Sequence, residues 1–325
     1  STSNNKTLFD DWIAFEESRN AQKTKDQYRQ AMNNFYRSLG CKLISTYNEE
    51  GKKERKMKLS GTKLSLFPKD ITPDMVSEWE KFMISEGLSA SSMSIYQRAF
   101  RAVMNHLKDE GIISEVPKMK IKSGNRRSDD YLTVPDILRI KNYAGENKWA
   151  ADWWLILYMC NGCNLRDLAS LKWDDNYEFD NELSFVRTKT AHRSPAQVYI
   201  PVIPELRNLL DQYASKSNKG ELVFPQILLD AKTEYQITNR VHDFNAAIRR
   251  GMINVCNELN IRIASASTAR NSYITCLTWH GISDAFIDAM VGHTDYNTVL
   301  RGYQVRISPK RLARLNSLLF INPEE

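Results

Sequence analysis

The stretch NGCNLRDLASLKW, residues 161–173, tells most about how this chain folds. It opens with Asn161-Gly162, a pair typical of a tight turn. Helix-favouring residues follow and predict a short helix over Arg166–Leu171. The stretch comes just after Lys148–Met159, whose apolar residues predict a mostly buried helix. A buried helix, a turn and a short helix that carries an arginine are therefore neighbours in the chain.

Mostly helical patterns continue on both sides of this stretch, through residues 131–325. Thr133 precedes a predicted helix over Val134–Ala144. Two β-rich runs, Leu183–Arg187 and Gln197–Val202, flank a polar, proline-containing segment and predict a hairpin with a long tip. Further helices are predicted at Pro204–Tyr213, Ile237–Leu259, Ser267–Trp279, Ser283–Val291 and Pro309–Phe320. We therefore expect a mixed, mostly helical domain with a small antiparallel β-sheet.

Residues 1–115 predict a separate helical domain. Thr24 and Gln27 have the spacing of a capping box, so a helix is predicted to begin at Thr24. The segment Cys41–Leu66 has no clear periodicity and many charges. We expect this segment to be an irregular, exposed excursion from the domain.

Two later helices complete this N-terminal domain. Thr72-Pro73 is a strong helix start, because proline is favoured in the first turn. Ser91 or Ser92 is predicted to begin the last helix. The face of this helix opposite its apolar residues contains Gln97, Arg98 and Arg101. The pattern predicts a small helical bundle.

The basic residues are concentrated in the predicted linker, residues 116–130. Its first twelve residues contain no acid and five basic side chains, Lys118, Lys120, Lys122, Arg126 and Arg127. The net charge of the whole chain is +6, so most of the excess lies here. Such a run is either a solvated tether or a segment that lies on nucleic acid phosphates.

Composition excludes several classes of protein. The chain has 325 residues and 42% hydrophobic residues, as expected for two globular domains. Its longest nearly apolar run, Trp153–Cys160, is far shorter than a membrane span, and no N-terminal segment resembles a signal peptide. Five cysteines argue against a disulfide framework and fit a reducing cytoplasm. Cys160 and Cys163 form one C-x-x-C without the second pair that a zinc site needs.

Five residues of the second domain stand beside turns or element ends. They are Arg166, Lys189, Arg270, His293 and Tyr303. Lys189 lies at the tip of the predicted hairpin, and Gly292 ends the helix before His293. Taken singly, each has an ordinary structural explanation, such as a surface charge or a core aromatic ring.

Together and in this order, these residues resemble those of the tyrosine recombinase (phage integrase) family. Residues 161–173 are similar to the family's first-arginine motif, G-x-R-x-x-E-L-x-x-L-x-W, with a loose match at the acidic position, which falls on Leu168 or Asp167. The segment Val-Gly-His-Thr, followed by Tyr303 ten residues after His293, resembles the family's closing motif. The resemblance covers almost the whole chain and implies a core-binding, SAM-like domain followed by a catalytic domain.

One position departs from the family pattern. The usual H-x-x-R box has Ser267 in place of the histidine, and Asn271 stands where a second histidine often follows the arginine. A serine hydroxyl can donate or accept a hydrogen bond but does not hold a proton near neutral pH. The resemblance therefore implies an altered site at Ser267.

The chemistry implied by the resemblance is transesterification of DNA. Tyr303 would attack the phosphorus and form a 3′-phosphotyrosyl bond, while Arg166 and Arg270 grip the phosphate. His293 would add a hydrogen bond, and Lys189 would protonate the leaving 5′ oxygen. Because the covalent bond conserves the phosphodiester energy and arginines handle the charge, neither ATP nor metal is expected.

The partner implied is double-stranded DNA, contacted by the basic linker residues and by Arg98 and Arg101. The family further implies a tetramer on two DNA sites, with the Pro309–Phe320 helix docking on a neighbouring subunit, and accessory DNA-bending proteins. The expected setting is a mobile element in the cytoplasm, near the nucleoid. Two other interpretations stay open: a type IB topoisomerase, and a DNA-binding protein that keeps the fold but has lost cleavage.

Overall fold

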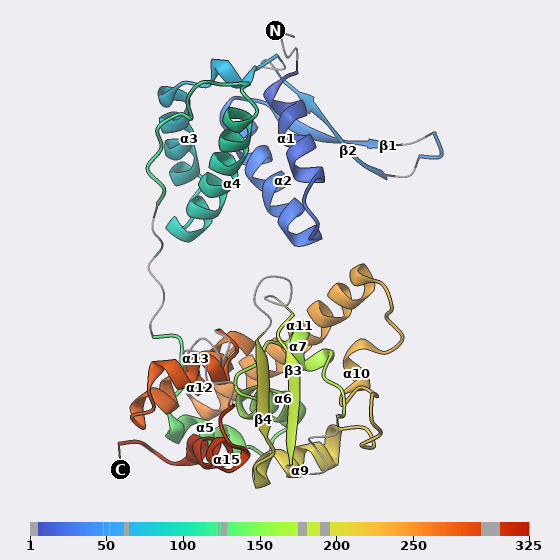
Figure 1. Ribbon diagram of the computed structural model, residues 1–325, viewed down its shortest axis with the longest axis vertical. Helices are drawn as coiled ribbons and strands as arrows, with labels where there is room; N and C mark the ends of the chain where they lie inside the picture. The colour runs from blue at the N-terminus through green and yellow to red at the C-terminus, as the bar shows by residue number, and fades with distance from the viewer. Residues whose placement is uncertain are drawn as a thin grey trace. The chain divides into compact units, whose positions relative to one another are not determined.

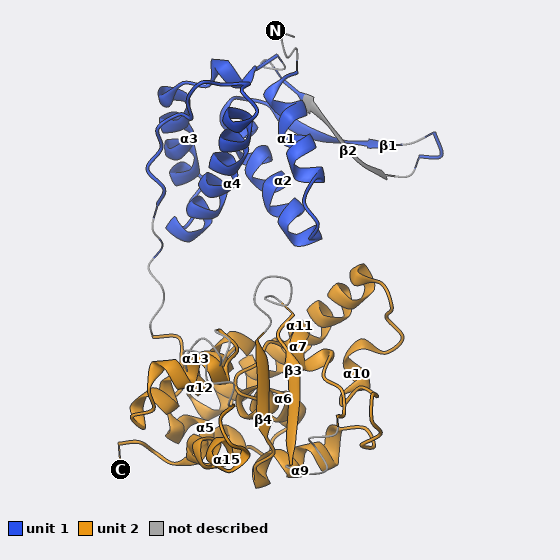
Figure 2. Cartoon of the chain, viewed as in Figure 1, with its two compact units in different colours: residues 1–127 blue, residues 128–325 orange. Residues whose placement is uncertain are grey.

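The structure is a computed structural model in which the chain forms two compact units, Ser1–Arg127 and Ser128–Glu325 (Figures 1 and 2). It describes residues 6–47, 49–51, 53–61, 65–122, 124, 129–174, 181–188, 196–293 and 306–324. The division between the units falls within the predicted linker, residues 116–130. Among the described residues, no helix is long and apolar enough to cross a membrane.

In its described residues, the first unit is a bundle of four α-helices. They are α1 (Leu8–Glu17), α2 (Gln22–Ser38), α3 (Pro73–Ser85) and α4 (Ala90–Asp109), with the short 3₁₀ helix η1 (Pro68–Asp70) before α3. Aromatic rings fill the core: Phe35 lies 5.3 Å from Trp79 and 5.2 Å from Phe100, between ring centroids. Asn34 accepts a 2.7 Å hydrogen bond from the indole of Trp79 inside this core. The bundle predicted from the sequence is confirmed.

Three details of this unit differ from the prediction. Helix α2 begins at Gln22 with Ala21 as its uncapped N-cap, so the capping box at Thr24 does not form. Helix α4 begins at Ala90, one residue before the earlier of the two predicted starts, with Ser89 as N-cap. The segment Cys41–Leu66 is not irregular, since strands β1 (Lys42–Tyr47) and β2 (Lys53–Ser60) pair there as an antiparallel hairpin.

The second unit is built around α6 (Lys148–Met159), whose bounds match the prediction. Ten of its twelve residues are buried, because helices pack on it from several sides. The surrounding helices are α5 (Val134–Lys141), α7 (Leu165–Ala169), α9 (Pro204–Tyr213), α10 (Pro225–Leu228), α11 (Glu234–Leu259), α12 (Ala266–Trp279) and α13 (Asp284–Met290). The mostly helical fold of this unit is as expected, with α5 ending three residues earlier than predicted.

A two-stranded antiparallel sheet and the C-terminal segment complete this unit (Figure 1). Strands β3 (Glu182–Val186) and β4 (Gln197–Pro201) pair antiparallel, which confirms the predicted pairing with bounds that differ by one residue. The predicted long tip of this hairpin, residues 189–195, lies outside the described residues. The predicted last helix is divided into α15 (Pro309–Asn316) and the 3₁₀ helix η2 (Ser317–Phe320). Both pack on their own unit, where Tyr158 donates a 2.6 Å hydrogen bond to the carbonyl of Leu319.

Candidate functional site

Arg270 lies in the second turn of α12, with its guanidinium turned towards two loops of the unit. Its Nη1 donates to the carbonyl of Gly162 over 3.0 Å, and its Nη2 donates to the carbonyl of Val291 over 2.8 Å. Burial, together with the positive charge of Arg187, lowers the pKa of Arg270 to about 10. The side chain is therefore a largely desolvated cation held by neutral acceptors.

Two glycines make room for this arrangement. Gly162 has φ +59°, and a Cβ there would meet the Cα of Arg270 at 2.7 Å. Gly292 has φ +72°, and a Cβ there would meet Val198 at 2.8 Å and the Cδ of Arg187 at 3.3 Å. Both the left-handed backbone and the close approach demand glycine at these turns.

His293 follows the turn that ends α13. Its backbone N–H donates to the carbonyl of Asp288 over 2.8 Å, and its Nδ1 lies 3.0 Å from the Asp288 carboxylate. Burial and the charges of Arg270 and Arg187 lower the pKa of the imidazole below 6.5, although Asp288 opposes this shift. The neutral ring therefore carries its proton most favourably on Nδ1, facing the carboxylate.

Arg187 belongs to this group, although the sequence did not single it out. It follows β3 directly, is only 8% exposed, and donates from Nη1 to the carbonyl of Gly292 over 3.2 Å. The one available signal was alternation: Leu183, Phe185 and Arg187 occupy the same face of the strand. An arginine that continues an inward-facing series points into its domain.

Arg166 lies on α7 and has a different environment. Its Nη2 donates to both carboxylate oxygens of Glu234, at 2.8 and 3.1 Å. Its neighbour Asp167 is buried and accepts the backbone N–H of Thr188 over 3.0 Å. The short helix thus fixes the end of β3 next to Arg187, while the guanidinium of Arg166 is paired with the first turn of α11.

Ser267 lies in the first turn of α12, three residues before Arg270. Its side chain is exposed, and its Oγ is 2.8 Å from the Oγ of Ser265, the N-cap of the helix. The Ser267 hydroxyl is therefore hydrogen-bonded to the residue that caps the same helix. Being three residues apart, Ser267 and Arg270 lie on the same face of α12.

A metal site has no support in the part of the chain that is described. No group of three or more His, Cys, Asp or Glu residues converges there. All five cysteines are buried and unpaired as disulfides. The pKa of Cys163 is raised by its hydrogen bond with Cys160 and by burial, so Cys163 is a buried, protonated thiol.

Family models match both units of the chain. The phage integrase family model matches residues 131–306, and the phage integrase SAM-like domain model matches residues 7–121. The chain belongs to the phage integrase family. A search of curated proteins by sequence found no match.

Solved structures of integrases share this fold. A dimer of lambda integrase residues 75–356 bound to a COC′ core site is 18% identical, with a TM-score of 0.59, over 93% of this chain and 99% of that chain. The Tn1549 transposon integrase in complex with transposon right end DNA is 14% identical, with a TM-score of 0.61, over 95% and 98%. A lambda integrase tetramer bound to a Holliday junction is 18% identical, with a TM-score of 0.59, over 94% and 82%. At these identities the likeness establishes the fold.

The remaining predicted site residues of this integrase-family chain fall into two groups. Lys189, Tyr303, Arg126 and Arg127 lie outside the described residues, so their roles stay predictions. The other predicted DNA contacts lie in the first unit: Lys118, Lys120 and Arg98 are exposed, while Lys122 forms a 2.7 Å ion pair with Glu80 and Arg101 donates to the carbonyl of Met119.

The predicted outer face of α4 is partly covered by the start of the linker. Gln97 is 1% exposed, contrary to the prediction. Its Oε1 accepts the backbone N–H of Lys122 over 2.8 Å, and its Nε2 donates to the carbonyl of Lys120 over 3.4 Å. The linker thus runs along α4 as far as Lys122 and leaves the side chains of Lys118 and Lys120 exposed.

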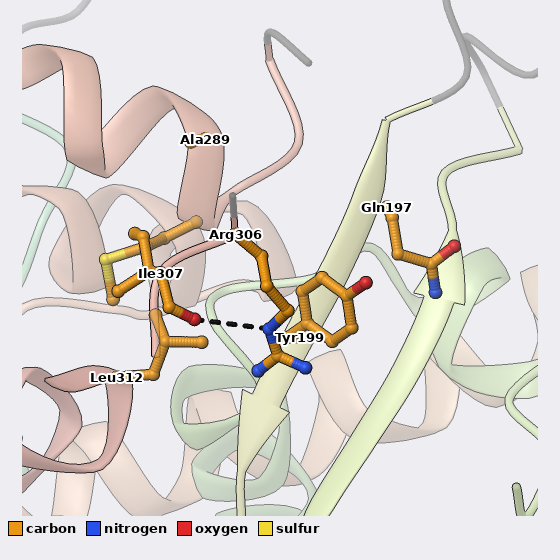
Figure 3. A pocket seen from close by; sticks show the side chains of 7 residues that line it. Gln197, Tyr199, Ala289, Arg306, Ile307 and Leu312 are labelled. Atoms are coloured by element: carbon orange, nitrogen blue, oxygen red, sulfur yellow. Dashed lines mark hydrogen bonds between the residues drawn. The ribbon is translucent and has the colours of Figure 1, made fainter. Parts of the chain in front are cut away.

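A small pocket lies between β4, α13 and the segment before α15 (Figure 3). It is lined by Gln197, Tyr199, Ala289, Met290, Arg306, Ile307 and Leu312. The guanidinium of Arg306 lies over the ring of Tyr199, 3.7 Å from its centroid, and pairs with the buried Glu182. These contacts fix the chain where the described residues resume at position 306.

Proposed function

We propose that the chain is a site-specific DNA recombinase of the integrase or invertase type, which cleaves and rejoins DNA through Tyr303. The observation that carries this proposal is the partly buried guanidinium of Arg270 beside His293. Among the described residues, this guanidinium donates to two backbone carbonyls, so its positive charge can still bind a phosphate anion. Membership of the phage integrase family supports DNA strand transfer as the reaction.

The proposed reaction joins Tyr303 to the 3′ side of a DNA break. The phenol loses its proton to solvent, the Oη–P bond forms, and the bond from phosphorus to the 5′ oxygen breaks. The ammonium of Lys189 gives a proton to that leaving oxygen. Rejoining reverses these steps with a 5′ hydroxyl from another strand. The bonds broken and formed are alike, so the scheme needs no ATP and no metal ion.

Arg270 and His293 act on the charge of the reacting phosphate. The guanidinium can donate two parallel hydrogen bonds to the non-bridging oxygens. An approaching anion raises the pKa of His293, since it favours the charged ring. The imidazolium can then donate from Nε2 to the phosphate while Nδ1 keeps its contact with Asp288. Arg166 is the other arginine predicted to grip the phosphate. To reach it, the guanidinium of Arg166 must leave its ion pair with Glu234.

We also propose a tetramer on two DNA sites, helped by DNA-bending proteins. In the single chain, the C-terminal segment buries Leu312 and Leu319 in its own unit. Docking in trans would therefore require α15 to exchange these contacts for equivalent ones on a neighbour. A monomer–tetramer comparison by crosslinking at the C-terminal segment, with and without DNA, tests this part of the proposal.

The central test is covalent trapping on DNA. A randomised duplex library is first selected for binding by the full chain, and the selected duplex is then nicked to give suicide substrates. A protein–DNA adduct that disappears in Tyr303→Phe supports cleavage. Binding without any adduct would instead support a DNA-binding protein that has lost cleavage. Exchange between two duplexes supports a recombinase, whereas relaxation of supercoils without exchange supports a topoisomerase.

A further inference from the structure

We propose that the β1–β2 hairpin of the first unit is an arm that binds the phosphates of double-stranded DNA. This inference rests on the proposed function, because it takes DNA as the partner. It adds a contact surface to which none of the DNA contacts predicted from the sequence belongs, since those lie on α4 and in the linker.

The first support is the place of the positive charge in the N-terminal part of the chain. Residues 42–60, from the first residue of β1 to the last residue of β2, contain six basic and three acidic residues. The rest of residues 1–115 contains 12 basic and 13 acidic residues. The hairpin therefore accounts for the whole positive excess of this part of the chain. A positive excess on one element attracts a polyanion such as DNA.

The second support is the attachment of the hairpin to the bundle. Cys41, directly before β1, is 1% exposed, and Leu43 packs against the core of the bundle. Gly61, directly after β2, has φ +138°, and a Cβ there would meet the Cα of Cys41 at 2.8 Å and the carbonyl oxygen of Gly40 at 2.9 Å. The two ends of the hairpin are therefore held close together at the bundle. A fixed base lets a short arm keep one direction.

The third support is the exposed surface of β1. The side chains of Ile44 and Tyr47 are 50% and 64% exposed, and Figure 1 shows β1 leading away from α1–α4. Among the described residues, β1 and β2 pair only with each other. An isolated two-stranded hairpin is marginally stable in water, so a surface that covers it would stabilise it. The major groove of DNA has the width to admit such a two-stranded ribbon.

Charge favours DNA over a second copy of this chain as the partner of the arm. The whole chain has a net charge of +6, so a second copy would on average repel a basic arm, whereas DNA phosphates attract it. The strand register places Lys58 opposite Ile44 and Lys53 opposite Tyr47. An alternation of apolar and basic residues suits a DNA backbone, in which sugars alternate with phosphates.

The test measures how the affinity of the full chain for the selected duplex depends on salt. In the arm variant, four basic residues of β2 become glutamine: Lys53→Gln, Arg55→Gln, Lys56→Gln and Lys58→Gln. We expect its affinity at about 100 mM salt to fall at least 10-fold, and the slope of log affinity against log salt to become shallower by about 2–4, because each phosphate contact contributes about 0.9.

A matched control removes the same number of charges from the same unit. It changes four exposed lysines outside the hairpin, Lys6→Gln, Lys23→Gln, Lys69→Gln and Lys108→Gln. Its salt slope should stay within about 1 of the wild-type value, because these lysines are not proposed to contact phosphate.

A second variant removes the outer part of the arm and keeps its base. Ser45 and Met57 are paired in the strand register, so a two-residue Asn-Gly turn can join them in place of residues 46–56. Hydroxyl-radical footprinting of the selected duplex should then lose one patch of protection that the wild type gives. At saturating protein, the Tyr303 adduct on the suicide duplex should still form.

Four results would overturn the inference. They are an equal salt slope in wild type and arm variant, an equal loss in the lysine control, an unchanged footprint in the shortened variant, and a loss of crosslinked oligomers without any loss of DNA affinity. The last result would identify a second copy of the chain as the partner of the arm. If the wild type binds no duplex from the library, it is the proposed function that fails.

Discussion

Replacing Gly292 by alanine tests whether the turn before His293 depends on a missing side chain. Two costs can be separated. The first is the left-handed backbone, φ +72°, which costs a residue with a Cβ about 1–2 kcal/mol. The second is overlap, because the new Cβ would lie 2.8 Å from Val198 Cγ2 and 3.3 Å from Arg187 Cδ. Overpacking of this kind costs about 1–3 kcal/mol. We therefore expect Gly292→Ala to lower the free energy of unfolding by about 2–5 kcal/mol.

Gly281 provides a matched control for this variant. It also ends a helix of the second unit, with φ +78°, but nothing lies within 4 Å of the place that a Cβ would take. Gly281→Ala should therefore cost only the backbone part, about 1–2 kcal/mol. The assay is guanidinium chloride unfolding of the full chain, read by hydrogen exchange mass spectrometry so that peptides of the two units are resolved.

The two variants should also differ in DNA cleavage. The overlap also displaces the turn that holds Arg270 through the Val291 carbonyl and that leads into His293. Gly292→Ala should therefore slow adduct formation on the suicide duplex at least 10-fold, in line with the cost of a misplaced phosphate-binding group. Gly281→Ala should leave the rate unchanged. Equal stability and equal cleavage in the two variants would refute the reasoning, because it would show that the close approach at Gly292 has no energetic consequence.

Three further predictions concern other contacts. The pKa of His293 should lie below 6.5 in the free chain and rise on DNA binding, so that the affinity for DNA falls as pH increases through the bound-state pKa. NMR titration of the imidazole with and without DNA measures both pKa values. Equal values would contradict the proposed phosphate contact. Asn34→Leu leaves the Trp79 indole N–H buried without its acceptor and should cost the first unit about 1–3 kcal/mol in denaturant unfolding, with no cost expected if water can enter instead. Gln97→Leu should release the linker from α4, because it removes the hydrogen bonds to the backbone of Lys120 and Lys122. Trypsin should then cleave faster after these two lysines, and DNA binding should weaken. An unchanged cleavage rate would show that other contacts hold this segment.

Local sequence signals were sufficient where the apolar residues and the start signal lie within one helix. The predicted bounds of α6 and α9 agree with the structure, because the apolar run of α6 and the Pro204 start of α9 act within each helix itself. The β1–β2 hairpin was missed for the opposite reason. In β1, Ile44 and Tyr47 are 50% and 64% exposed, so the strand has no apolar face that would give a period of two.

The candidate site was only partly predictable because its contacts join distant segments. Arg270 and His293 stand out beside turns in the sequence, but Arg187 meets Gly292 across 105 positions of the chain. Gln97 illustrates the same limit in the first unit. The helical pattern placed it on an outer face, and only the structure shows the linker backbone lying on that face. Residue types in the sequence therefore indicate what kind of ligand a side chain can bind, whereas the structure shows which cationic side chains lie in the same site.

The turn at Asn161-Gly162 links the arginine site to the C-terminal segment through buried amides. Asn161 donates to the carbonyls of Tyr199 and Met290, at 2.9 and 3.0 Å, and accepts from Asn316 over 2.8 Å. Asn316 in turn accepts the hydroxyl of Tyr273 over 2.7 Å. Removal of one buried partner leaves the next polar group without a hydrogen bond, so the stabilities of these hydrogen bonds are coupled. Because Gly162 supplies a carbonyl to Arg270, the position of that guanidinium depends on α15 being docked.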